Sequence, residues 1–246
     1  MALGSAGFLF AAVGDVHGRM NRMVSFLQSW TKNAHRELAF VLQVGDFEPH
    51  RDEADLATMA APARYKHLGD FADYHQNLGH VGVVEPRGLR VVGVSGIHDE
   101  GGFQKPHLPL SRLGSVSSKD FTCFNEEDID RAMAMERADV LLVHDWPSGI
   151  IAPQDREDFE QQRRSPNAEA VGNDYARLVA EALEPSLVLC GHLHKSYRGT
   201  LAHASGRVSQ VCCLASVEQG ADAFAVFHAT PMGLLEVTRL GAPEQG

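Results

Sequence analysis

Short apolar runs alternate along the chain with longer segments in which apolar and polar residues mix. The runs are four to seven residues long and are bounded by glycine or polar residues, which is the pattern of buried strands. Two of them are separated only by Glu85-Pro86-Arg87-Gly88, which predicts a hairpin. The predicted strands are Phe8–Val13, Leu38–Val44, Val81–Val84, Leu89–Val94, Val140–Val143, Leu187–Cys190, Val208–Leu214, Phe224–Phe227 and Leu234–Val237.

The segments between these runs favour helices, with one exception. The pattern predicts helices over Asn21–His35, Ala54–Tyr74, Glu126–Arg137 and Asn173–Leu183. Gly96–Asn125 is rich in Gly, Pro and Ser and is predicted to be a long surface loop over the strand ends. The sequence contains neither an internal repeat nor a linker between two domains. We therefore expect a single domain over residues 1–246, built as an α/β sandwich.

Composition narrows the classes of function. The net charge of −10, from 32 acidic and 22 basic residues, argues against a broad electrostatic grip on nucleic-acid backbones, so an anionic substrate needs a local source of positive charge. The longest apolar run is far shorter than the roughly 20 residues that cross a bilayer. The first basic residue is Arg19, which does not fit a secretory signal, and the four cysteines form neither a C-x-x-C pair nor a zinc-finger spacing. We expect a cytoplasmic protein without a membrane span, a structural zinc or a disulfide frame.

Metal-ligating side chains follow several of the predicted strands. Because parallel strands present their carboxyl ends at one edge of a sheet, these side chains are expected to meet there. Residues two apart in an extended segment point the same way, so both side chains of an Asp-x-His or His-x-His motif can converge. Carboxylate and neutral imidazole together suit Mn, Fe or Zn better than calcium. The candidate ligands are Asp15, His17, Asp46, His144, His192 and His194.

These motifs resemble those of the calcineurin-like metallophosphoesterase family, whose pattern runs Asp-x-His, Gly-Asp, Gly-Asn-His-Asp/Glu, a lone His and Gly-His-x-His. The resemblance implies a four-layer α/β/β/α sandwich with two divalent metal ions. In that family a metal-bridging water or hydroxide attacks phosphorus in line while the ions neutralise phosphate charge. By resemblance, the first ion would be held by Asp15, His17, Asp46 and His194, and the second by Asp46, His144 and His192.

Two stretches carry a more specific resemblance, to the RNA lariat debranching enzymes. One runs from Gly45-Asp46-Phe47-Glu48 through Glu53-Ala54-Asp55-Leu56 and Tyr65-Lys66-His67-Leu68 to Tyr74, and the other is His144-Asp145-Trp146-Pro147. They imply a phosphodiesterase ancestry and a nucleotide or RNA substrate.

The chain departs from the family pattern at the Gly-Asn-His-Asp/Glu motif, which supplies a metal-ligating Asn and a His that protonates the leaving group. The nearest match is Gly96-Ile97-His98-Asp99, in which Ile97 is unable to ligate a metal. The family's motif precedes a hairpin of the kind predicted at Val81–Val94, whereas His98 follows it. We interpret the segment that carries this motif as absent, with His98 as a substitute general acid; the alternative is an exposed loop histidine. If a parallel strand is missing from the sheet, its neighbours must close up or leave backbone groups unpaired.

The sequence leaves three functions open. The first is a metal-dependent phosphoesterase, more specifically a phosphodiesterase. The second is a catalytically weak or inactive member that serves as a binding scaffold, which the departure at Gly96–Asp99 motivates. The third, a phosphomonoesterase, shares the chemistry of the first.

Overall fold

The computed structural model describes residues 7–47, 80–112, 122–157, 159 and 171–239 and contains two β-sheets. The first sheet has the strand order β10-β9-β1-β2, and the second has the order β3-β4-β5-β6-β8-β7. Strands β1 and β2 are parallel neighbours, and β4, β5, β6 and β8 are parallel to one another. The strands are β1 (Phe8–Val13), β2 (Val41–Gln43), β3 (Val81–Val84), β4 (Val91–Val94), β5 (Val140–Val143), β6 (Leu187–Cys190), β7 (Tyr197–Ala202), β8 (Val208–Cys213), β9 (Phe224–Thr230) and β10 (Gly233–Arg239).

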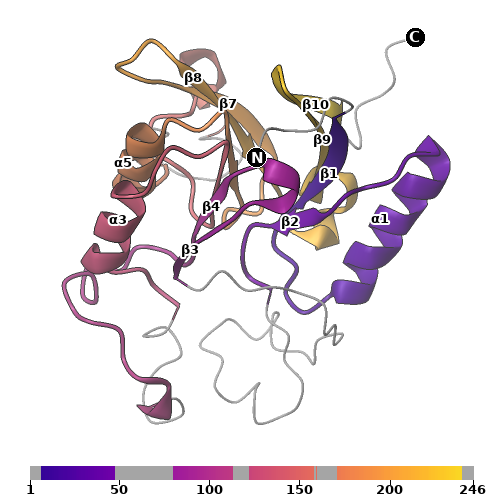
Figure 1. Cartoon of the computed structure of the whole chain (residues 1–246). Coiled ribbons are helices and arrows are strands. Elements are labelled where there is room, and N and C mark those ends of the chain that lie inside the picture. The colour runs from indigo at the N-terminus through magenta and orange to yellow at the C-terminus, as the bar shows by residue number, and fades with distance from the viewer. Residues whose placement is uncertain (1–6, 48–79, 113–121, 158, 160–170, 240–246) are drawn as a thin grey trace.

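The helices lie on the outer faces of the two sheets. Helix α1 (Met20–Ala34) covers the first sheet, and α3 (Glu126–Met133) and α5 (Asp174–Leu183) cover the second on the opposite side of the molecule (Figure 1). The order is thus helix, sheet, sheet, helix. This is the four-layer α/β/β/α sandwich that the resemblance implied.

The alternation of side chains along a strand explains these layers. In β1, Leu9, Ala11 and Val13 pack against α1, whereas Phe10 and Ala12 point to the other side and pack against the second sheet. Strands of the second sheet behave in the same way, so one apolar layer lies between the sheets and another lies under each helix layer. Nearly continuous apolar runs are required because both faces of each central strand are buried.

Side-chain caps fix where α3 and α5 begin. The side chain of Asn125 accepts a hydrogen bond from the backbone N–H of Asp128 at 3.0 Å, and the Asp128 carboxylate accepts one in return from the backbone N–H of Asn125 at 3.1 Å. Asn173 caps α5 by accepting from the backbone N–H groups of Tyr175 and Ala176. Both helices therefore start at the residues that orient their apolar faces toward the second sheet.

Most predicted elements are confirmed, with two main differences. The predicted strand Leu38–Val44 forms only over Val41–Gln43. Strand β7 was not predicted, because its sequence mixes Arg, Gly and Thr with few apolar residues and most of its side chains are only partly buried. The hairpin is confirmed as β3 and β4, and the parallel strands of the second sheet pair without a gap. The predicted helix Ala54–Tyr74 lies outside the described residues. Within the described residues no helix is long and apolar enough to cross a membrane.

Candidate metal centre

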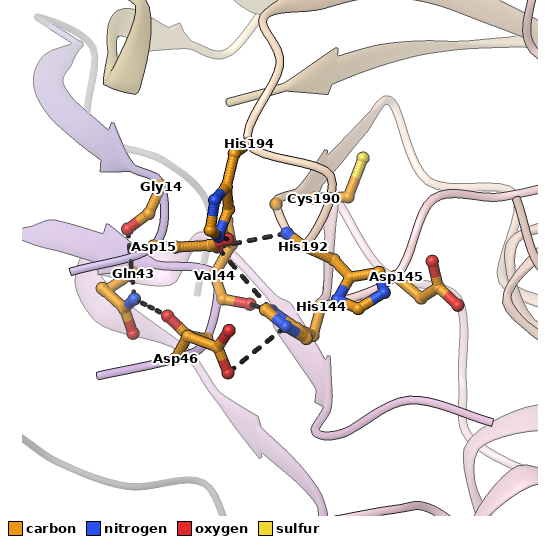
Figure 2. Close-up of polar contacts among 12 residues, drawn as sticks. Gly14, Asp15, Gln43, Val44, Asp46, His144, Asp145, Cys190, His192 and His194 are labelled. Carbon is orange, nitrogen blue, oxygen red and sulfur yellow. Dashed lines mark hydrogen bonds and ion pairs between the residues drawn. The ribbon is translucent and has the colours of Figure 1, made fainter. Parts of the chain in front are cut away.

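The candidate ligands lie where the carboxyl ends of strands from both sheets meet. Asp15 and Asp46 follow the parallel neighbours β1 and β2, and the loops that carry them are joined by hydrogen bonds from the backbone N–H groups of Val16 and His17 to the Asp46 carbonyl, at 3.2 and 2.7 Å. His144 and His192 follow the parallel neighbours β5 and β6 in the second sheet. Each sheet thus contributes half of the set (Figure 2).

Four of these residues form a compact group. The side chains of Asp15, His17, Asp46 and His194 each offer a ligand atom, and these atoms all lie within 4.8 Å of one another. His194 Nε2 lies 3.0 Å from Asp15 Oδ2 and 2.9 Å from His17 Nε2, while His17 Nε2 lies 3.9 Å from Asp46 Oδ2. This is the set that the resemblance implied for the first metal ion.

The carboxylate of Asp15 supports a cation at this position. Its side chain is fully buried. Oδ1 accepts a hydrogen bond from the backbone N–H of His192 at 3.2 Å, whereas Oδ2 makes no hydrogen bond within the described residues and lies 3.0 Å from His194 Nε2. A buried carboxylate with imidazole nitrogens around it fits a divalent cation, which offsets the cost of burying the negative charge and accepts the nitrogen lone pairs. The residues therefore fit a metal ion, and carboxylate with imidazole is the donor set of a transition metal such as Mn, Fe or Zn.

His144 and Asp46 form an ion pair beside this group. His144 Nε2 lies 3.4 Å from Asp46 Oδ1, and its Nδ1 lies 3.2 Å from the Val44 carbonyl and 3.8 Å from Asp15 Oδ1. Burial lowers the pKa of His144, but the hydrogen bond with Asp46 and the charges of both carboxylates outweigh burial and raise that pKa to about 9. Burial raises the pKa of Asp46, but the hydrogen bond and charge of His144 and the charges of neighbouring histidines lower it to about 2.

His192 lies further from the compact group than the other candidates. Its ring centroid is 5.1 Å from that of His144, in an edge-on arrangement. Burial, followed by the charge of His144, lowers the pKa of His192, so its imidazole is neutral at pH 7 and offers a lone pair. In the described part of the chain, the ligand atoms of Asp46, His144 and His192 do not all lie within 4.8 Å of one another. These three residues are therefore less compact than the group of Asp15, His17, Asp46 and His194.

The backbone at the candidate ligands corrects one prediction. His17, Asp46, His192 and His194 have φ values of 48°, 44°, 63° and 50°, so the two motifs are turns in the left-handed region and not extended segments. The side chains converge because each turn redirects the chain, not because residues two apart share a strand face. The turns also separate the two histidines of the second motif, since His194 joins Asp15 and His17 whereas His192 lies beside His144.

Two glycines next to the ligands are needed for space. A Cβ on Gly45 would collide with the ring of His144, and a Cβ on Gly191 would collide with the carboxylate of Asp15. Gly45 also has a φ of 132°, which side chains with a Cβ rarely adopt. Glycine at both positions therefore lets the backbone lie close to the ligand side chains.

Two residues that support the cluster were not identified from the sequence. The Gln43 side-chain amide donates to the carbonyl of Gly14 at 3.2 Å and to the carbonyl of Gly45, so it ties the loop carrying Asp15 to the loop carrying Asp46 (Figure 2). The indole N–H of Trp146 donates to the Gly191 carbonyl at 2.7 Å, and its ring is fully buried. The available signal for Gln43 was that it is the one polar residue in the apolar run Leu38–Val44.

His98 lies in a different environment from the ligands. Its ring packs against Phe103 and Tyr175, with centroids 5.2 and 4.9 Å away, near α5. The ring is partly buried, so the alternative of an exposed loop histidine does not describe it. The described contacts of His98 are with aromatic rings and not with the six candidate ligands. Its role as general acid stays a prediction.

A four-layer sandwich with histidine and aspartate side chains at the edge where both sheets meet is the arrangement that the resemblance to the calcineurin-like metallophosphoesterases implied. Among curated proteins the chain is similar to lariat debranching enzymes. It is 27% identical over 229 residues to that of Entamoeba histolytica, 23% over 246 residues to that of Arabidopsis thaliana, and 23% over 234 residues to that of Homo sapiens. These similarities confirm the resemblance to the lariat debranching members of the class.

The matches cover most of this chain but only part of each relative. They span 76%, 83% and 78% of the chain, and 64%, 59% and 43% of the enzymes of Entamoeba histolytica, Arabidopsis thaliana and Homo sapiens. The chain thus spans less than two thirds of the length of these relatives. No family model matches it.

Proposed function

We propose that this protein is a metal-dependent phosphodiesterase that acts on a phosphodiester of a nucleotide or RNA. The observation that carries the proposal is the compact group of Asp15, His17, Asp46 and His194, in which the Asp15 carboxylate is fully buried. The substrate class is supported by the similarity to lariat debranching enzymes. A chain of net charge −10 binds a phosphate only with a local source of positive charge, which a metal centre supplies.

The proposal assigns two divalent ions, of Mn, Fe or Zn. One would be held by Asp15, His17, Asp46 and His194, and the other by Asp46, His144 and His192, so Asp46 contributes to both. Ions bound there supply Lewis-acid chemistry, which activates water and neutralises charge on phosphate oxygens. Asp46 is suited to two ions because its oxygens face opposite partners, Oδ2 toward His17 and Oδ1 toward His144.

The protein's own residues orient these ligands. Val44 holds the His144 ring through its carbonyl, and the Asp15 carboxylate is fixed by the backbone N–H of His192. His144 must lose its proton before it ligates a metal, so its raised pKa couples metal loading to proton release. We propose His98 as the group that protonates the leaving oxygen, on the sequence alone.

The test compares Asp46→Asn with Asp130→Asn, a matched change at an exposed residue of α3. The purified chain is loaded with Mn²⁺ and assayed on bis-p-nitrophenyl phosphate and on a 2′,5′-linked dinucleotide. We expect Asp46→Asn to lower kcat/KM by on the order of 10²-fold or more, because several kcal/mol of transition-state charge stabilisation depend on the metal. Unchanged activity of Asp46→Asn would reject the proposal.

The rival function is a binding scaffold, which the aromatic surroundings of His98 favour. The same assay separates the two, because a scaffold gives no turnover above free Mn²⁺ while still binding the ion. A phosphomonoesterase would instead hydrolyse p-nitrophenyl phosphate faster than the diester. A single domain over residues 1–246 and a cytoplasmic location remain predictions from the sequence.

A further inference from the structure

A second group of metal-ligating side chains lies outside the candidate centre. It consists of His80, His107 and Asp128, whose ligand atoms all lie within 4.8 Å of one another. His80 directly precedes β3, His107 lies in the segment that follows β4, and Asp128 lies in the first turn of α3. None of these segments supplies a candidate ligand of the first centre. The three residues are far apart in the sequence, so no motif spacing identifies them.

The geometry of the group suits a tetrahedral ion. Asp128 Oδ2 lies 2.5 Å from His107 Nε2 and 4.0 Å from His80 Nδ1. Zinc bonds of about 2.0–2.2 Å to nitrogen and oxygen place the ligand atoms of a tetrahedral site about 3.3 Å apart, which falls between these two distances. The two rings are stacked with centroids 3.7 Å apart, and a nitrogen of each lies within 4.0 Å of the same carboxylate oxygen. Because the lone pairs of stacked rings run nearly parallel, binding one ion requires one ring to rotate out of the stack together with movements of about 1 Å, estimated from those bond lengths.

Burial and charge in the group favour a cation with one open position. The Asp128 side chain is 2% exposed, whereas His80 and His107 are 37% and 29% exposed, so an ion can enter from solvent and keep a water ligand. Arg131 competes for the same carboxylate, but its Nη1 lies 3.9 Å from Oδ1 and its side chain is 54% exposed. Oδ2 faces the two imidazoles and also accepts the capping hydrogen bond from the Asn125 N–H at 3.1 Å.

We propose that His80, His107 and Asp128 bind a borderline divalent ion, for which Zn²⁺ is the best match, separate from the candidate catalytic centre. The ion would join β3, the segment after β4 and the start of α3. Existing hydrogen bonds already bring these segments together, from Asn125 Nδ2 to the Lys105 carbonyl and from the Ser95 N–H to the His80 carbonyl. Figure 1 shows β3 close to α3.

The test measures Zn²⁺ per chain by equilibrium dialysis in a background that carries Asp46→Asn, His192→Ala and His194→Ala, which removes ligands of both ions proposed for the candidate metal centre. We expect this background to retain zinc at the second group. Adding His80→Ala, at a partly exposed position, should weaken that binding at least about ten-fold. Asp128→Asn should do the same while leaving an oxygen to accept from the Asn125 N–H and cap α3.

The matched control adds His35→Asn to the same background, at an exposed left-handed position that asparagine tolerates. It should leave zinc binding unchanged. Two results would overturn the proposal: zinc binding that is unchanged by His80→Ala and Asp128→Asn, or a background that binds no zinc. Either result would mean that the three side chains form only a hydrogen-bonded cluster. Because the readout is zinc and not turnover, failure here leaves the proposed phosphodiesterase function untouched, and the reverse also holds.

Discussion

Four of the six candidate ligands have backbones in the left-handed region. For residues other than glycine such conformations cost on the order of 1–3 kcal/mol each and persist only where the surrounding structure fixes them. At His17 and Asp46 the fixing contacts are the backbone hydrogen bonds between the two loops, and at His192 the N–H is held by the buried Asp15. The backbone thus fixes the ligand directions in the protein without a bound ion.

Replacing Gly45 with alanine tests how closely the backbone approaches a ligand. Gly45 and Gly233 have nearly the same φ, 132° and 135°, but a Cβ on Gly45 would meet the His144 ring, whereas a Cβ on Gly233 has nothing within 4 Å. We expect Gly233→Ala to cost only the backbone strain, about 1–3 kcal/mol. Gly45→Ala should lower the free energy of unfolding further and weaken metal binding. Urea denaturation and metal titration of both variants provide the measurement, and equal effects would refute the role of His144 contact.

The His144–Asp46 pair predicts a pH dependence for the stability of the metal-free protein. The pKa of His144 rises from 6.5 to about 9 on folding, so its contribution is fully present below pH 6.5 and is lost as the pH rises through about 9. The pKa of Asp46 falls from 3.8 to about 2, so its contribution is present above pH 3.8 and is lost as the pH falls through about 2. Denaturation at pH 5, 7 and 9.5 with chelator present should show stability falling toward pH 9.5. His144→Gln should reduce that fall, and an identical fall in His144→Gln would contradict the assignment.

At the scale of elements, the strands that the sequence predicted best are those buried on both faces. β1, β5 and β6 form over the predicted residues, because near-continuous apolar runs are required there. β7 was not predicted, because it lies at the edge of its sheet and its sequence mixes polar and apolar residues. The six candidate ligands could be predicted because each follows an apolar run, although the run before Asp46 forms the edge strand β2. The turns that aim them could not, because φ at a histidine depends on long-range contacts such as that between Asp15 and His192.

Gln43 shows how an element end supports the centre, and its removal is the prediction at this scale. Gln43→Met keeps the length of the side chain but removes the donor that ties the Gly14 and Gly45 carbonyls together. We expect metal affinity to fall by about 10- to 100-fold, the usual effect of losing a group that orients metal ligands. Gln28→Met, at an exposed position on α1, is the matched control and should bind metal like the parent. Titration with Mn²⁺ measures the affinity of both variants. An unchanged affinity in Gln43→Met would show that the hydrogen bonds of Gln43 do not support the metal centre.

At the scale of the whole molecule, the candidate centre joins the two sheets. Asp15, His17 and Asp46 follow strands of the first sheet, whereas the histidines at 144, 192 and 194 follow strands of the second. A second connection is the pair of Arg198 in β7 and Glu236 in β10, whose closest atoms are 2.6 Å apart. Within the metal centre, however, the sheets meet through buried polar side chains. One atom of this interface, Asp15 Oδ2, is buried and makes no hydrogen bond within the described residues.

Metal removal should therefore lower the melting temperature of the entire sandwich and not only of one loop. A ligand present at a hundred times its Kd stabilises the folded state by about 2.7 kcal/mol, and for a chain of this size each kcal/mol corresponds to about 2–4 °C, so saturating Mn²⁺ should raise the melting temperature by about 5–10 °C. The measurement uses His80→Ala as the parent, so that only the candidate centre responds. In that parent, Asp46→Asn should abolish the shift because it removes the carboxylate that both proposed ions share, whereas Asp130→Asn should preserve it. A metal-induced shift that survives Asp46→Asn would mean that the ion binds outside this centre, and the sheets would then be joined without it.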